Sequence, residues 1–188
     1  MSDSETEFDF EELFAEELDA VPDERFDRER FVPGAGPVDA DVALVGEAPG
    51  ATEVEAGEPF VGQAGRRLDG LLETAGIDRD AVYVTNLVKV RPPENRDPTA
   101  DERRAWKPLL DAELERVDPA VVVTLGAVAS GAVLDSDEPI KELRDETYEV
   151  DGRLVLPTYH PAATFYDDDV EPMLERDLRV AAEIADGE

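Results

Sequence analysis

The chain contains a single histidine, His160, which lies between an apolar run and a proline. An imidazole titrates near neutral pH, so it can exchange a proton or donate a hydrogen bond to a developing negative charge. Pro161 restricts the backbone of the residue before it, which helps to hold the imidazole in one place. An isolated histidine is most often structural, but this composition keeps histidine at one position only. His160 is therefore the first candidate for a catalytic group.

A glycine-rich segment, GEAPGATEVEAGEPFVGQAG over residues 46–65, carries two further candidates. Its glycines allow the backbone to approach a ligand closely. The Glu47 carboxylate could orient a water molecule, and Phe60 could stack on a planar base, which is worth about 1–3 kcal/mol per base. The alternatives are a plain connection between strand and helix, a dinucleotide-binding loop or a P-loop. The motifs GxGxxG and GKS or GKT, which the last two require, are absent.

A third segment, TNLVKVRPPENR over residues 85–96, combines an amide with positive charge. Asn86 ends an apolar run, and its amide offers both a donor and an acceptor to an amide-like edge. Three cations follow it: Lys89, Arg91 and Arg96. We expect them to contact a phosphate backbone, which needs a local positive patch. The alternative is that they pair with acids nearby in the sequence, such as Glu94 and Asp97.

The elements that position these residues follow from hydrophobic patterns. Four apolar runs, over 42–46, 81–86, 120–126 and 153–158, are typical of strands buried on both faces. Helical spacing of apolar residues lies over 62–76, over 99–117 with Thr99 as N-cap, and over 171–185. This alternation predicts a three-layer α/β/α domain with a central, mainly parallel, four-stranded sheet.

Ligands bind such sheets at the carboxyl ends of the strands. We therefore expect residues of different kinds to converge on one edge. They are Gly46, Glu47, Ala48, Asn86, Lys89, Arg91, Gly126 and His160.

The chain is predicted to form one domain over residues 31–188, preceded by an acidic arm over residues 1–30. The apolar side chains of the arm, at positions 8, 10, 13, 14 and 18, are expected to dock on the body. The sequence lacks an apolar run long enough to span a membrane, and its N-terminus is acidic where a targeting peptide would be basic. We expect a cytoplasmic monomer.

The charge balance is extreme, with 48 acidic against 18 basic residues and a net charge of −30. Concentrated salt would screen the resulting self-repulsion, because the Debye length falls to about 3 Å at 1 M. We interpret the composition as adaptation to high internal salt, a halophilic trait. The alternatives are a disordered acidic chain and a mimic of an acidic partner. The chain has no cysteine, which excludes disulfides and cysteine-held metal centres.

Together the three segments resemble the uracil-DNA glycosylase superfamily, and they are most similar to family 4, the Fe–S type. The resemblance runs from Val38 to Ile184 and rests on GEAPG with PFVGQAG, on TNLVK and RPPENR, and on YHPAA, in that order. It implies an enzyme that flips uracil out of DNA and hydrolyses its N-glycosidic bond in base excision repair. Uracil-containing DNA would be its partner, with a repair assembly as a further possible partner.

The resemblance also implies a role for each matching residue. Asn86 would bind the O4 and N3–H edge of uracil, and Phe60 would stack on the base. His160 would stabilise the negative charge on O2 as the bond breaks, and Glu47 would position water. Gly46 and Ala48 would border the base, and Ala48 stands where other relatives carry a water-activating Asp. Lys89, Arg91, Arg96 and Gly126 would contact the DNA backbone.

Two departures from the family are visible. Its four cysteines hold a [4Fe–4S] cluster, but this chain has Val90 and Trp106 at two of those positions and none in the arm. We predict that the cluster is absent, that no other cofactor or metal is used, and that Val90 and Trp106 fill its volume. After YHPAA the family continues with Leu and a basic residue that wedge into the base stack. Here Phe165 is the wedge candidate, with three acids close behind it.

We therefore predict a monofunctional uracil-DNA glycosylase. The alternative is a catalytically inactive member of the same fold that still binds uracil or DNA. A third possibility, a relative that binds covalently through a histidine of the second motif, conflicts with the absence of histidine there.

Overall fold

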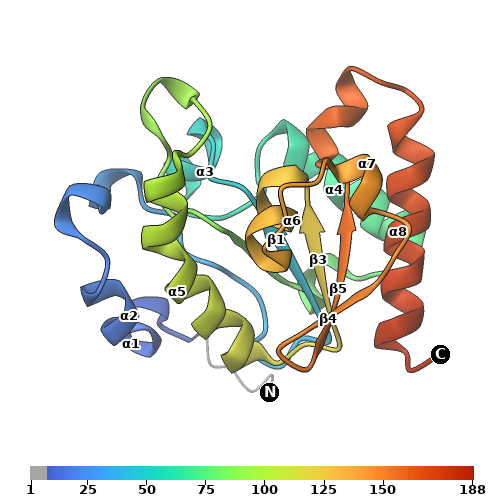
Figure 1. Cartoon of the computed structure of the whole chain (residues 1–188), viewed down its shortest axis with the longest axis horizontal. Coiled ribbons are helices and arrows are strands. Elements are labelled where there is room, and N and C mark those ends of the chain that lie inside the picture. The colour runs from blue at the N-terminus through green and yellow to red at the C-terminus, as the bar shows by residue number, and fades with distance from the viewer. Residues whose placement is uncertain (1–7) are drawn as a thin grey trace, which may run out of the picture.

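The computed structural model describes residues 8–188, so the first seven residues of the predicted arm lie outside the described part. A five-stranded sheet forms the centre, in the order β2-β1-β3-β5-β4. The strands are β1 (Val42–Gly46), β2 (Tyr83–Asn86), β3 (Val121–Leu125), β4 (Tyr148–Val150) and β5 (Arg153–Thr158). Helices cover both faces of the sheet, which confirms the three-layer α/β/α fold (Figure 1).

The four predicted strands are all present and all parallel to their neighbours within that set. The sequence prediction missed β4, which pairs antiparallel with β5 at the edge. Its three residues are partly exposed and too few to show a pattern. Asp151 and Gly152 connect it to β5 with positive φ angles of 50° and 79°. An Asp-Gly pair with this geometry is a preferred two-residue hairpin turn, and this signal could have revealed the strand.

Two apolar cores form, one on each face of the sheet. The helices α4 (Gln63–Ala75) and α8 (Val170–Ala185) pack on one face, and Leu68, Leu72, Leu174 and Leu178 from them are fully buried. On the other face lie α5 (Ala100–Val117) and α6 (Ala127–Leu134). Short helices complete the fold: α1 (Phe10–Leu13), α2 (Ala15–Asp19), α3 (Ala51–Ala56), α7 (Ile140–Leu143) and the 3₁₀ helix η5 (Pro161–Phe165).

The start of α5 confirms the predicted N-cap. The Thr99 hydroxyl accepts the amide N–H of Glu102 at 3.2 Å, and the Glu102 carboxylate accepts that of Thr99 at 2.8 Å. This reciprocal capping box satisfies two amides that the helix itself leaves without partners. The first turn of α5 lies beside the segment over residues 85–96, because Glu102 also accepts hydrogen bonds from Arg96.

The described part of the acidic arm docks on the body through its aromatic residues. Phe10, Phe14 and Leu18 are buried in the core on the α5 side, whereas Leu13 stays partly exposed. Phe8 is partly buried and packs against the same core, so the docking predicted from the spacing holds for four of the five positions. None of the helices within residues 8–188 combines the length and apolar character that crossing a membrane requires.

Candidate active site at the carboxyl edge of the sheet

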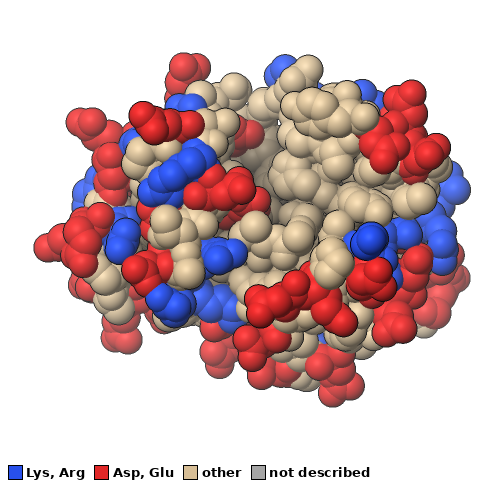
Figure 2. All heavy atoms as spheres, turned by 45° about the horizontal axis from the view of Figure 1, so that its top comes forward, with Lys and Arg blue, Asp and Glu red and all other residues tan. Residues whose placement is uncertain are grey.

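The carboxyl ends of the four parallel strands meet at one edge, which is the upper edge in Figure 1. Parallel register places Gly46 of β1 beside Asn86 of β2, and Leu125 of β3 beside Thr158 of β5. The candidate residues therefore project from neighbouring positions although they are far apart in sequence. Figure 2 shows this face hollowed, with mostly uncharged atoms lining the hollow and both acidic and basic residues around it.

Gly46 allows Asn86 and Phe60 to approach one another. A Cβ atom at Gly46 would lie 2.5 Å from Asn86 Oδ1 and 2.5 Å from Phe60 Cζ, closer than any side chain tolerates. Asn86 is buried, with only 3% of its surface exposed. The structure thus brings together an amide edge and an aromatic ring, as the sequence predicted.

Phe60 is held in a strained backbone conformation. Its φ angle is +55°, a region that bulky residues rarely adopt. A Cβ atom at Gly65 would lie 1.8 Å from the Phe60 carbonyl oxygen, so only glycine fits where α4 packs against this residue. The ring centroid lies 5.8 Å from that of His160, with the planes tilted by 32°.

Glu53, which the sequence analysis did not single out, braces the loop that carries Glu47 and Phe60. Its carboxylate accepts the amide N–H of Gly50 and that of Gly62, each at 3.2 Å. One side chain in α3 therefore joins the two ends of the loop. An acid three residues after a glycine gave no recognisable signal of this role.

His160 is fixed in a defined tautomer. Its Nδ1 atom accepts the amide N–H of Ala162 at 3.1 Å, so in the neutral ring the proton is on Nε2. Burial lowers the pKa of His160, and the nearby Glu53 opposes that shift only in part. At neutral pH the ring is therefore uncharged and presents Nε2–H as a donor.

Gly126 packs closely against His160. A Cβ atom there would lie 3.2 Å from the His160 Cβ, and the positive φ of 93° also favours glycine. Its amide N–H donates to the Thr158 carbonyl at 2.8 Å. The Gly126 amide N–H is therefore engaged within the protein, whereas the predicted contact of Gly126 with the DNA backbone stays a prediction.

Glu47 lies directly after β1 and is only partly exposed. Its pKa is raised to about 7, first by burial and then by the negative charge of Asp97, while Arg103 acts in the opposite direction. Near neutral pH the protonated and the ionised forms of this carboxyl are therefore both populated. Arg103, on the first turns of α5, is a contributor that the sequence analysis missed.

The prediction that Lys89 contacts phosphate is wrong. Lys89 is fully buried, and its Nζ lies 2.6 Å from Glu113 Oε2 on α5. It also donates to the backbone carbonyl of Asn86. Glu113 is itself fully buried and accepts the hydroxyls of Tyr83 and Thr85 at 2.8 and 2.7 Å. The ammonium group thus fixes the end of β2 from inside the protein.

The two arginines of the predicted patch differ in their hydrogen-bond partners within the protein. Arg96 forms two hydrogen bonds with the Glu102 carboxylate, at 2.7 and 2.8 Å, so its charge is largely compensated. The pairing that we considered as an alternative therefore occurs, but with Glu102 as the acid. Arg91 differs, because its buried Nε has no hydrogen-bond partner among the described residues.

The segment after His160 presents two aromatic side chains with different surroundings. Thr164 is buried, and its hydroxyl donates to the Pro161 carbonyl at 2.7 Å. Phe165 is 36% exposed and lies under the Arg67 guanidinium, whose Cζ is 5.2 Å from the ring centroid. Tyr166, which the sequence analysis passed over as a wedge, is 90% exposed.

The residues at the family's cluster positions do not fit an iron–sulfur cluster. Trp106 is fully buried, with its ring centroid 5.3 Å from that of Phe26 and 6.2 Å from that of Phe31. Val90 forms a β-bridge with Phe31 and packs on the same apolar core. Cluster iron requires thiolate or imidazole ligands, and these side chains offer none. Within residues 8–188 no group of three or more potential metal-ligating side chains comes together.

Comparison with known proteins gives consistent matches. Residues 33–179 match the family model described as the Uracil DNA glycosylase superfamily. The chain is 39% identical over 167 residues to a Type-4 uracil-DNA glycosylase of Sulfurisphaera tokodaii, covering 84% of this chain and 76% of that protein. It is 41% identical over 165 residues to the corresponding protein of Saccharolobus solfataricus, covering 83% and 76%. For that of Thermotoga maritima the identity is 42% over 137 residues, covering 72% and 71%.

The environment of Glu47 leads to a direct prediction. In the wild-type protein the Glu47 carboxyl should titrate at about pH 7, because burial and Asp97 both disfavour its charge. Asp97→Asn should lower the Glu47 pKa, and Arg103→Leu should raise it further, in carboxyl ¹³C NMR titrations. Since the folded-state pKa is raised, this group's contribution to stability should be lost as the pH rises through about 7. A Glu47 signal that titrates near the ordinary glutamate range would contradict this description.

Proposed function

This chain belongs to the uracil-DNA glycosylase superfamily, and from that premise we propose that it removes uracil from DNA by hydrolysing the N-glycosidic bond. The observation that carries the proposal is the convergence of Asn86, Phe60 and His160 around Gly46 and Gly126 at one sheet edge. An amide edge, an aromatic face and a neutral donor are the groups that a flipped uracil requires. The reaction leaves an abasic site and an intact strand.

Recognition of the base rests on Asn86 and Phe60. One end of the Asn86 amide accepts a hydrogen bond from uracil N3–H, and the other donates to O4. Phe60 stacks on the ring, which is worth about 1–3 kcal/mol per base. Gly46, and Ala48 after it, leave space for the base against the strand end. The Lys89–Glu113 ion pair supports this arrangement by holding the carbonyl of Asn86.

Departure of uracil rests on His160. As the bond breaks, negative charge develops on the base, and His160 stabilises it at O2 through its Nε2–H donor. A preorganised donor of this kind contributes about 3–4 kcal/mol to transition-state stabilisation in a water-poor site. A neutral ring is sufficient for this role, because the imidazole donates a hydrogen bond and keeps its proton.

Glu47 orients the water that attacks the sugar. With its pKa at about 7, the carboxyl is partly ionised at neutral pH and can accept a hydrogen bond from that water. Ala48 provides no second carboxylate next to it. Leaving-group stabilisation by His160 therefore carries the larger part of catalysis in this proposal.

DNA handling rests on the loop after His160 and on a reduced set of cations. Extruding a nucleotide costs a few kcal/mol, and a side chain inserted into the vacated stack offsets part of that cost. We assign the wedge to Phe165, with the exposed Tyr166 beside it. Arg91 remains the clearest candidate for a phosphate contact, while Arg96 contributes only if Glu102 releases it. The acids that follow Tyr166 repel phosphate unless salt screens them.

The enzyme is proposed to work without an iron–sulfur cluster, as a monomer in a cytoplasm of high salt. The packing of Trp106 against Phe26 and Phe31 supports the first point, because apolar contacts replace a ligand-held core. The net charge of −30 supports adaptation to salt. A repair assembly that recruits the acidic arm would be compatible with this proposal.

The central test is excision from a uracil-containing oligonucleotide in molar KCl, followed by alkaline cleavage of abasic sites. The wild-type protein should give product in a preparation whose iron content is at background. His160→Ala should lower kcat by about 10²- to 10³-fold, the loss typical of removing one oxyanion donor. Arg116→Ala, at an exposed position on α5, is the matched control and should keep the wild-type rate.

Three outcomes would count against the proposal. No product from single- or double-stranded substrate at any salt concentration would favour the alternative, a member that binds uracil or DNA without turnover. Activity that appears only with bound iron would overturn the cluster-free proposal. A full rate for His160→Ala would remove the role given to the imidazole.

The wedge assignment makes a separate prediction. Phe165→Ala should lower kcat/KM on double-stranded substrate by about tenfold, roughly the effect of losing one stacking contact, and should leave single-stranded DNA almost unaffected. The reason is that only the duplex has a stack to fill. Tyr166→Ala, compared in the same assay, shows which aromatic enters the stack. Equal losses on both substrates would indicate that neither acts as a wedge.

A further inference from the structure

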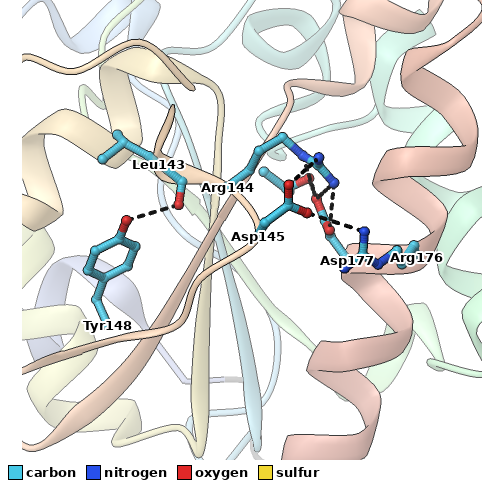
Figure 3. Close-up of polar contacts among 7 residues, drawn as sticks. Leu143, Arg144, Asp145, Tyr148, Arg176 and Asp177 are labelled. Atoms are coloured by element: carbon cyan, nitrogen blue, oxygen red, sulfur yellow. Dashed lines mark hydrogen bonds and ion pairs between the residues drawn. The ribbon is translucent and has the colours of Figure 1, made fainter. Parts of the chain in front are cut away.

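A second buried ion pair lies behind the histidine, between α8 and the residue that follows α7. Asp177 on α8 accepts three hydrogen bonds from Arg144: from Nε to Oδ2 at 3.3 Å, and from Nη2 to Oδ1 at 3.0 Å and Oδ2 at 3.1 Å (Figure 3). The side chains are only 7% and 6% exposed. The sequence analysis assigned neither residue a role.

This pair contacts the two residues that immediately precede His160. The Thr158 hydroxyl donates to Asp177 Oδ2 at 2.6 Å. The Arg144 guanidinium lies over the ring of Tyr159, with its Cζ 5.5 Å from the centroid. On the other side, the Thr158 carbonyl accepts the amide N–H of Gly126. The backbone that leads into the catalytic residue is therefore held on both sides.

We propose that Arg144 and Asp177 are positioning residues for His160, an inference that rests on the proposed function. His160 stands two residues beyond the end of β5, where hydrogen bonds of the sheet no longer constrain it. The pair extends that constraint through Thr158 and Tyr159, so that Nε2–H stays directed at the base. Lys89 and Glu113 do the same behind Asn86, where the ammonium group holds the residue's own carbonyl.

Stability alone is a weak explanation for this pair. Buried ion pairs are often no more stabilising than well-packed apolar residues of similar volume, because both charges lose their hydration. An outer set of charges continues the network to the surface, with Asp145 near Arg144 at 3.2 Å and near Arg176 at 3.3 Å. Arg176 is largely exposed, so this outer pair offers a matched control on the same elements.

The decisive variant replaces the pair by apolar side chains, Arg144→Met with Asp177→Leu. It should fold with an unfolding midpoint near that of the wild type, yet kcat for uracil excision should fall by about tenfold to a hundredfold. A loss of this size is expected when a catalytic group shifts by about 1 Å. KM should change little, because Asn86 and Phe60 bind the base. The control, Asp145→Ala with Arg176→Ala, should retain the wild-type kcat.

A double-mutant cycle separates positioning from general damage. In a His160→Ala background the same pair replacement should cause almost no further loss, since it acts through the missing imidazole. Thr158→Val removes only the hydroxyl that Asp177 accepts, and it should lower kcat by about threefold to tenfold. This milder variant decides the question if the pair replacement does not fold.

A folded pair replacement with wild-type kcat, or an equal loss in the His160→Ala background, would overturn the inference. A wild-type kcat for Thr158→Val would do the same where the pair replacement does not fold. These results differ from failure of the proposed function, which would appear as an inactive wild-type protein.

Discussion

The parallel register of four strands is the constraint on which the candidate site depends. Each strand is buried on both faces, so a shift by one residue would move a set of apolar side chains to the wrong core. This register places Gly46 beside Asn86 and Leu125 beside Thr158. The loops that leave these positions then have little freedom, and Phe60 and His160 meet although they lie in different motifs. The strand register therefore brings these residues to one edge of the sheet, and polar contacts hold them there.

Two buried ion pairs hold the residues at this edge in place, and their charged groups lie inside the protein. Lys89 and Glu113 fix the end of β2, while Arg144 and Asp177 fix the segment after β5. In the proposed function, the groups that face the base are an amide, an aromatic ring and a neutral imidazole. This separation of buried charges from uncharged binding groups matters in a chain of net charge −30. The proposed function therefore predicts that base binding needs no screening by salt, whereas contact with the DNA backbone depends on it.

Apolar runs and helical spacing predicted most of the fold and motifs predicted most of the pocket. The four parallel strands, the helix cap at Thr99 and the grouping of Asn86, Phe60 and His160 were accessible in this way. The role of Lys89 was not, because its partner Glu113 lies on a distant helix and spacing along the chain does not show which side chains meet. Asp177 was hidden for the same reason. The strand β4 was too short and too exposed to form a pattern, although its Asp-Gly turn was visible.

The most direct test of this account is the protonation state of the one imidazole. Long-range ¹H–¹⁵N NMR of the protein labelled at its single histidine distinguishes the two neutral tautomers and the charged ring. At pH 7 the account predicts a neutral ring with its proton on Nε2, because Nδ1 accepts the Ala162 amide and burial lowers the pKa of His160. A charged ring, or a proton on Nδ1, would contradict the mechanism at its centre.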